Sequence, residues 1–154
     1  MLPERFLDSI LALLARDGHP DEMDAFIQAQ SQPSARGLRA NRLRVADRDT
    51  LNGLLTRTLE LEWPMVPVPW TLDGLYYPPD RSPAGQVAYH AGLFYIQEPS
   101  AMLPAELLGA RPGERVLDLC AAPGGKSCRI AADLAGEGLL WANDISADRI
   151  RPLI

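Results

Sequence analysis

The sequence predicts an α/β fold, with a small α+β domain over residues 1–90 followed by the beginning of a parallel sheet over residues 91–154. Beyond residue 91, strand patterns and helix patterns alternate with tight turns between them, which is typical of a parallel sheet covered by helices. Before that point, helical patterns mix with short proline-bounded strands. Only two strands of the parallel sheet are recognisable, so we expect this second part to be truncated.

Three helices are predicted in the first part. Residues 3–16 place apolar side chains at helical spacing, and Gly18 and Pro20 end that pattern. Residues 21–30 begin with acidic side chains, which suit the positive end of a helix dipole. Residues 48–58 carry leucines on one helical side.

The remaining segments of the first part predict short strands. Residues 36–45 alternate in the manner of a strand, although neither face is purely apolar. Prolines surround two further short strands, near residues 65–69 and 74–77, so we expect both at a sheet edge. Residues 80–86 have the composition of an exposed loop.

The second part has a regular order of elements. The expected elements are a strand over 92–97, a helix over 99–108, a strand over 115–119, a helix over 124–135, a strand over 139–143 and a helix capped by Ser146. This order is the start of an open α/β sheet, in which ligands bind beyond the carboxyl ends of the strands.

Charge and composition narrow the class of protein. The net charge of −5 argues against a general polyanion binder, but residues 31–60 hold six arginines against three carboxylates and predict a local basic surface. No apolar run is long enough for a membrane span, and the first residues lack the order of a signal peptide, so we expect a cytoplasmic protein. Two cysteines and two distant histidines predict neither a disulfide framework nor a metal site.

The turn after the strand at 115–119 has the properties of a nucleotide-like cofactor site. Gly124 and Gly125 lack a Cβ and allow a ligand to approach the backbone closely. The helix that follows offers free N–H groups, and Pro123 fits just before its first turn. Asp144 stands at the end of the next strand, where a carboxylate binds ribose hydroxyls.

Three alternatives for this turn are a phosphate-binding loop, a dinucleotide site and a turn that binds no ligand. A phosphate-binding loop requires a glycine at position 120, where Cys120 stands, although Gly125, Lys126 and Ser127 match the end of that motif. A dinucleotide site requires G-x-G-x-x-G, which is absent. A strand, turn and helix without any ligand remains open.

Four segments carry a resemblance to a known family. Residues 118–127, Asp-Leu-Cys-Ala-Ala-Pro-Gly-Gly-Lys-Ser, closely resemble the cofactor motif of the Sun family of S-adenosylmethionine-dependent RNA cytosine-5 methyltransferases. Residues 39–44 resemble its R-x-N-x-L-[KR] signature, residues 92–102 resemble the segment before the cofactor motif, and residues 143–146 resemble the end of its second strand. The bacterial branch that modifies small-subunit ribosomal RNA is the most similar.

The resemblance implies a class I (Rossmann-like) methyltransferase sheet with S-adenosylmethionine bound at its first turn. Asp144 would accept hydrogen bonds from the ribose, and Asp118 would hold the turn. Gln97 and Ser100 would lie near the methionine end of the cofactor, or act only as a strand end and a helix cap. The residues expected to wrap the cofactor are Cys120, Ala121, Ala122, Pro123, Gly124, Gly125 and Lys126. The residues expected to contact RNA phosphates, or else to be solvated surface arginines, are Arg36, Arg39, Arg42 and Arg44.

The family's reaction requires a cysteine thiolate that adds to C6 of cytosine. Neither Cys120 nor Cys128 matches a catalytic motif of the family, so we expect the nucleophile beyond Ile154 and a fragment that is inactive by itself. The alternative is a non-catalytic RNA- or ribosome-docking module over residues 1–90 with a vestigial methyltransferase segment. The coding sequence beyond residue 154 distinguishes the two.

Overall fold

The computed structural model describes residues 2–58 and 65–151, which belong to two compact units. One unit ends at Ser34 and the other begins at Ala35. The sequence predicts a boundary elsewhere, between residues 1–90 and 91–154, and that boundary stays a prediction. Within the described residues, no helix is both long and apolar enough to cross a membrane.

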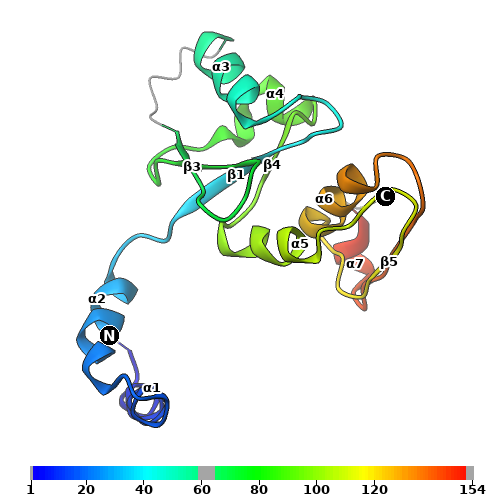
Figure 1. The fold of residues 1–154 in the computed structure, drawn as a ribbon. Coiled ribbons are helices and arrows are strands. Elements are labelled where there is room, and N and C mark those ends of the chain that lie inside the picture. The colour runs from blue at the N-terminus through cyan, green and yellow to red at the C-terminus, as the bar shows by residue number, and fades with distance from the viewer. Residues whose placement is uncertain (1, 59–64, 152–154) are drawn as a thin grey trace. The chain divides into compact units, whose positions relative to one another are not determined.

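The first unit is a helical hairpin (Figure 1). Helix α1, Glu4–Asp17, ends at Gly18, whose left-handed backbone (φ 88°) lets its N–H donate to Ala15. The short 3₁₀ helix η1, Pro20–Glu22, leads into α2, Met23–Ser31. Both predicted helices are confirmed.

The second unit begins with a four-stranded antiparallel sheet in the order β2-β3-β1-β4. Its strands are β1 (Arg36–Ala40), β2 (Val66–Pro67), β3 (Gly74–Tyr77) and β4 (Phe94–Ile96). The predicted edge position of residues 74–77 is wrong, because β3 lies between β2 and β1. These four residues contain no proline, so all of their N–H groups remain free to pair.

The strand predicted over residues 36–45 ends early. Asn41 closes a turn after Ala40, since its backbone oxygen accepts from the N–H groups of Arg44 and Val45. Its side-chain oxygen also accepts from the N–H of Leu43. Side-chain hydrogen bonds of this kind compete with strand pairing, so the prediction beyond Ala40 is wrong.

One hydrophobic core lies between the antiparallel sheet and α3, Arg48–Thr58. Leu51 and Leu55 of α3 are fully buried with Leu38 of β1. Asp47 caps the helix by accepting the N–H of Thr50 at 2.7 Å. The predicted loop at 80–86 contains the 3₁₀ helix η2, Pro83–Gly85, and α4, Val87–His90, follows it.

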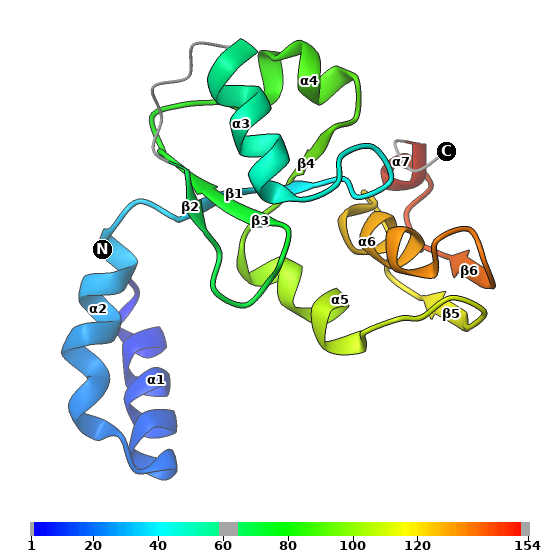
Figure 2. The same cartoon turned by 45° about the horizontal axis from the view of Figure 1, so that its top comes forward.

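The rest of the unit is the predicted parallel sheet (Figure 2). A connection made of η3 (Ser100–Met102) and α5 (Leu103–Leu108) leads to β5, Arg115–Asp118. Strand β5 pairs in parallel with β6, Leu139–Ala142, and the elements that follow the two strands are α6 (Gly125–Leu134) and α7 (Ala147–Ile150). The strand, helix, strand and helix order is confirmed.

Helix α6 covers one face of the parallel pair. Ile130 and Leu134 are buried there against Val116 and Leu140. Strand β4, which the sequence placed with this second part, instead pairs antiparallel with β1. The antiparallel sheet therefore includes the strand that immediately precedes the parallel unit.

Candidate functional site

Asp118 stabilises the turn between β5 and α6 through two hydrogen bonds. One carboxylate oxygen accepts the Cys120 N–H at 3.2 Å, and the other accepts the Ser127 hydroxyl at 2.7 Å. The same side chain therefore joins the end of the strand to the first turn of the helix. This is the role that the sequence assigned to Asp118.

The turn itself closes over four residues. Gly124 donates its N–H to the Ala121 carbonyl at 2.8 Å, and the Ala122–Pro123 peptide within the turn is cis. Gly124 has a φ of 116°, a conformation that glycine adopts at little cost.

Three N–H groups at the start of α6 lie beyond this turn. Those of Gly125, Lys126 and Ser127 precede the first intrahelical bond, which joins the Cys128 N–H to Gly124. Within the described part of the chain, none of the three has a hydrogen-bond acceptor. The helix thus presents free donors and the positive end of its dipole at this position.

Asp144 approaches the turn from the end of β6. Its carboxylate accepts the Ala122 N–H at 3.1 Å and the Ser146 N–H at 3.0 Å. The bond from Ser146 is the main cause that holds the pKa of Asp144 below its usual value. Arg149, which the sequence patterns did not single out, donates to the Ala122 carbonyl at 2.6 Å.

Side chains from the antiparallel sheet, and from Gln97 directly after it, form hydrogen bonds at this turn. Arg39 is 2% exposed and donates through Nη2 to the Gly125 carbonyl at 2.8 Å and through Nε to Gln97 Oε1 at 3.0 Å. Gln97 in turn donates to the Ala101 carbonyl at 2.9 Å. The Tyr95 hydroxyl donates to the Pro123 carbonyl at 3.2 Å.

The four arginines expected to meet RNA occupy two environments. Arg36, Arg42 and Arg44 are exposed, and Arg42 forms a 3.3 Å ion pair with Asp133. Arg39 is buried, and burial lowers its pKa. The alternation over residues 36–45 places Arg39 on the strand face opposite the other three, but neither face is purely apolar, so the pattern does not indicate that Arg39 is buried.

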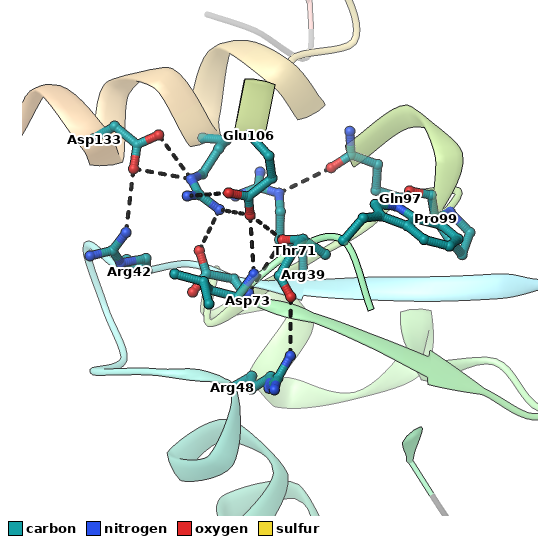
Figure 3. Close-up of polar contacts among 12 residues, drawn as sticks. Arg39, Arg42, Arg48, Thr71, Asp73, Gln97, Pro99, Glu106 and Asp133 are labelled. Carbon is teal, nitrogen blue, oxygen red and sulfur yellow. Dashed lines mark hydrogen bonds and ion pairs between the residues drawn. The ribbon is translucent and has the colours of Figure 1, made fainter. Parts of the chain in front are cut away.

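A second cluster of charges contains the carboxylates of Asp73, Glu106 and Asp133 (Figure 3), all of which accept from Arg129 of α6. Its guanidinium donates to Asp73 at 2.7 Å, to Glu106 at 2.6 and 3.1 Å, and to Asp133 at 2.9 Å. Glu106 also accepts the Thr71 hydroxyl. No sequence motif indicated this cluster, because Asp73 and Glu106 lie outside α6, which holds Arg129 and Asp133.

The pKa shifts in this cluster follow from burial and pairing. Burial raises the pKa of Asp73, and the nearby Arg129 opposes that effect only in part. Burial alone would also raise the pKa of Glu106, but hydrogen bonds from Thr71 and Arg129 outweigh it and lower the pKa. In the same way, contacts with Asp133 and Glu106 overcome desolvation and raise the pKa of Arg129.

The residues of this site do not suggest a metal centre. In the two described stretches, no three His, Cys, Asp or Glu side chains come together as metal ligands would. Cys120 and Cys128 are free thiols at exposed positions. The donor set at the turn consists of backbone N–H groups and one carboxylate, which suits an organic ligand with an anionic group and hydroxyls.

Comparison with known proteins agrees with this geometry. Residues 2–99 match the family described as the N-terminal domain of 16S rRNA methyltransferase RsmF, and residues 105–154 match the family 16S rRNA methyltransferase RsmB/F. The fold and site thus define the start of a Rossmann-like methyltransferase domain behind a smaller α+β segment. The chain belongs to the RsmF family of 16S rRNA methyltransferases, the bacterial branch of the Sun family, and corresponds to the N-terminal portion.

Individual relatives cover the whole chain. It is 38% identical to ribosomal RNA small subunit methyltransferase F of Vibrio cholerae and 40% identical to that of Vibrio vulnificus, over 99% of its length in each case. The chain spans about a third (32%) of the length of these curated relatives.

Solved structures show the same fold. A methyltransferase homolog protein from Pyrococcus horikoshii matches 97% of the chain at 29% identity and a TM-score of 0.73, with 51% of that protein covered. NSun6 from the same organism, solved with SFG, has a TM-score of 0.80 over 98% of the chain and 61% of its own length. At 18% identity the second likeness concerns the fold alone.

Proposed function

We propose that this chain forms the cofactor-binding turn and an RNA-docking segment of an S-adenosylmethionine-dependent cytosine-5 methyltransferase that acts on small-subunit ribosomal RNA in the bacterial cytoplasm. The observation that carries the proposal is the meeting of Asp144 with the turn whose following helix has three free N–H groups. The relatives named ribosomal RNA small subunit methyltransferase F support the substrate, and the match of residues 105–154 to the RsmB/F methyltransferase family supports the cofactor.

The turn binds the cofactor through backbone and carboxylate groups. Residues 120–126 surround its methionine and ribose parts, and the free N–H groups of Lys126 and Ser127 suit an anionic group. Each oxygen of Asp144 accepts one backbone N–H, from Ala122 or from Ser146, so further lone pairs remain for ribose hydroxyls. Its lowered pKa keeps it ionised at neutral pH.

The cofactor supplies the methyl group, and this chain positions it. The cysteine that activates the target cytosine lies outside residues 1–154, because Cys120 belongs to the cofactor turn and Cys128 to the helix behind it. Residues 1–90 act in RNA docking. Arg36, Arg42 and Arg44 are exposed there, and exposed arginines neutralise phosphates.

The test uses the protein that carries this chain. Calorimetry measures its affinity for S-adenosylmethionine, and incubation with labelled cofactor and small ribosomal subunits measures methyl transfer. Bisulfite sequencing of the RNA then locates any 5-methylcytosine. Binding together with cytosine-5 methylation supports the proposal. RNA binding without any cofactor binding overturns it and favours the docking module.

A further inference from the structure

Arg39 is the one arginine of the R-x-N-x-L-R segment that reaches the cofactor turn. It belongs to β1, 86 residues before the Gly125 carbonyl that it contacts. Its guanidinium uses two separate N–H groups, since Nη2 donates to Gly125 and Nε donates to Gln97. Figure 3 shows the contact between Arg39 and Gln97. A planar guanidinium suits two acceptors at a fixed angle, whereas an ammonium group is a single point of charge.

Tyr95 of β4 and Gln97, the residue directly after β4, also pack against the turn. An added Cβ at Gly125 would meet Gln97 Nε2 at 3.1 Å and the Tyr95 ring at 3.2 Å, so the turn lies directly against both side chains. Tyr95 also donates to the Pro123 carbonyl. The backbone on either side of Gly124 is thus held by donors from β1 and β4.

These contacts fix the direction of the peptide groups that face the cofactor. In a trans peptide, the C=O and the following N–H point in opposite directions. A donor on the Gly125 carbonyl therefore orients the N–H of Lys126 away from the antiparallel sheet. The peptide held by Tyr95 is the one whose N–H, on Gly124, closes the turn onto Ala121.

Burial separates Arg39 from its neighbours in the sequence. Arg42 and Arg44 are exposed, whereas Arg39 is 2% exposed with two protein acceptors at 2.8 and 3.0 Å. A phosphate contact would require both the release of these acceptors and an opening of the interior. An unpaired buried acceptor is costly, so the contacts within the protein are favoured.

We infer that Arg39, with Tyr95, is a positioning residue for S-adenosylmethionine rather than an RNA contact: it holds the carbonyl face of the cofactor turn so that the opposite N–H face is ready for the ligand. The inference rests on the proposed function. It makes the antiparallel sheet part of the cofactor site and assigns the first arginine of the segment a task different from that of the exposed arginines.

The test replaces Arg39 by lysine in the protein that carries this chain. Arg39→Lys keeps the charge but cannot hold both acceptors in the same geometry. Arg57→Lys is the matched control, because Arg57 lies exposed on α3 and, among the described residues, its Nε donates to Gly53 of the same helix. Tyr95→Phe is a second variant, which removes a single donor from a partly exposed ring. Steady-state assays give KM for S-adenosylmethionine, KM for RNA and kcat, and melting without ligand checks folding.

Arg39→Lys is expected to raise KM for S-adenosylmethionine by about tenfold, and Tyr95→Phe by about threefold, with KM for RNA unchanged. Arg57→Lys should match the wild type in all three constants. A cofactor KM that stays at the wild-type value in both variants overturns the inference, as does an RNA KM that rises by the same factor. If Arg39→Lys fails to fold, Tyr95→Phe decides. Failure of the wild type to bind the cofactor would instead refute the proposed function.

Discussion

Arg129 of α6 donates a 2.7 Å hydrogen bond to Asp73, which lies 56 residues earlier and immediately precedes β3. The two side chains are 6% and 4% exposed. This contact joins the helix behind the cofactor turn to the antiparallel sheet. Glu106 accepts from Nη1 and Nη2 and Asp133 accepts from Nε, so each nitrogen of the buried Arg129 guanidinium donates to a carboxylate.

Arg129→Met should strongly destabilise the chain. The substitution keeps much of the side-chain volume but leaves Asp73 and Glu106 without their cation, and a broken buried ion pair costs about 3 kcal/mol. Urea unfolding followed by circular dichroism measures the free energy of unfolding. Arg57→Met is the matched control, because an exposed arginine should contribute less than about 0.5 kcal/mol. Equal losses in the two variants would show that the buried cluster adds no stability.

Glu106→Gln should change how stability depends on pH. The pKa of Glu106 in the folded chain is lowered from 4.5, so its charge adds stability above that value, and this stability is lost as the pH falls through the lowered pKa. Glutamine has no such titration. The difference in unfolding free energy between wild type and variant should therefore be full at about pH 7 and shrink below about pH 4.5.

Urea midpoints for both proteins across this range provide the measurement. Asp73, whose pKa burial raises, titrates in the opposite sense and is present in both proteins, so its burial effect cancels in the difference, whereas the smaller part of its shift that Glu106 causes does not. A difference that stays constant down to about pH 3 would exclude an ionised Glu106 as the source of the stability.

The sequence patterns predicted the structural features that depend on residues close together in the chain. The turn at Gly124, the cap at Ser146 and the hold of Asp118 on the turn depend on neighbours within a few residues, and the structure has all three. Helical periodicity likewise located α1 and α3 to within one residue at each end.

What the patterns could not predict depends on residues far apart in the chain. Arg129 and Asp73 are both charged, and a charged residue in a helix or loop is most often exposed, so nothing local indicated a buried pair. Strand alternation places Arg39 on the face opposite Arg42 and Arg44, but with neither face purely apolar it does not indicate which face is buried. The contact of Arg39 with Gly125 appears only when β1 and α6 are placed together.

Gly125→Ala should weaken cofactor binding. The new Cβ would lie 3.1 Å from Gln97 Nε2 and 3.2 Å from the Tyr95 ring, so the turn must shift by a few tenths of an ångström. The affinity for S-adenosylmethionine in calorimetry should fall by about fivefold or more, because the N–H groups leave their aligned positions. Gly85→Ala is the control, since a Cβ there meets nothing within 4 Å. Wild-type affinity in Gly125→Ala would mean that the turn adapts freely.

Asp144→Asn should reduce cofactor affinity by about tenfold or more, because a neutral amide accepts weaker hydrogen bonds from the ribose and from Ala122. Asp148→Asn is the matched control from the same region, with a side chain that is 89% exposed and that pairs, within the described residues, with Arg151. Calorimetry with S-adenosylmethionine compares the two. An equal effect of both substitutions would point to net charge rather than to a contact made by Asp144.

Arg42→Gln and Arg44→Gln should weaken RNA binding without changing cofactor affinity. Both side chains are exposed beyond the end of β1, where each can neutralise a phosphate. Each substitution should lower the slope of log affinity against log salt by about one, because one fewer counterion is released. Arg16→Gln, in the separate helical hairpin, is the comparison, since Arg16 pairs with Asp17. If the salt slope of Arg42→Gln equals that of the wild type, the Asp133 ion pair is the whole role of Arg42, and the basic surface must be sought in Arg36 and Arg44.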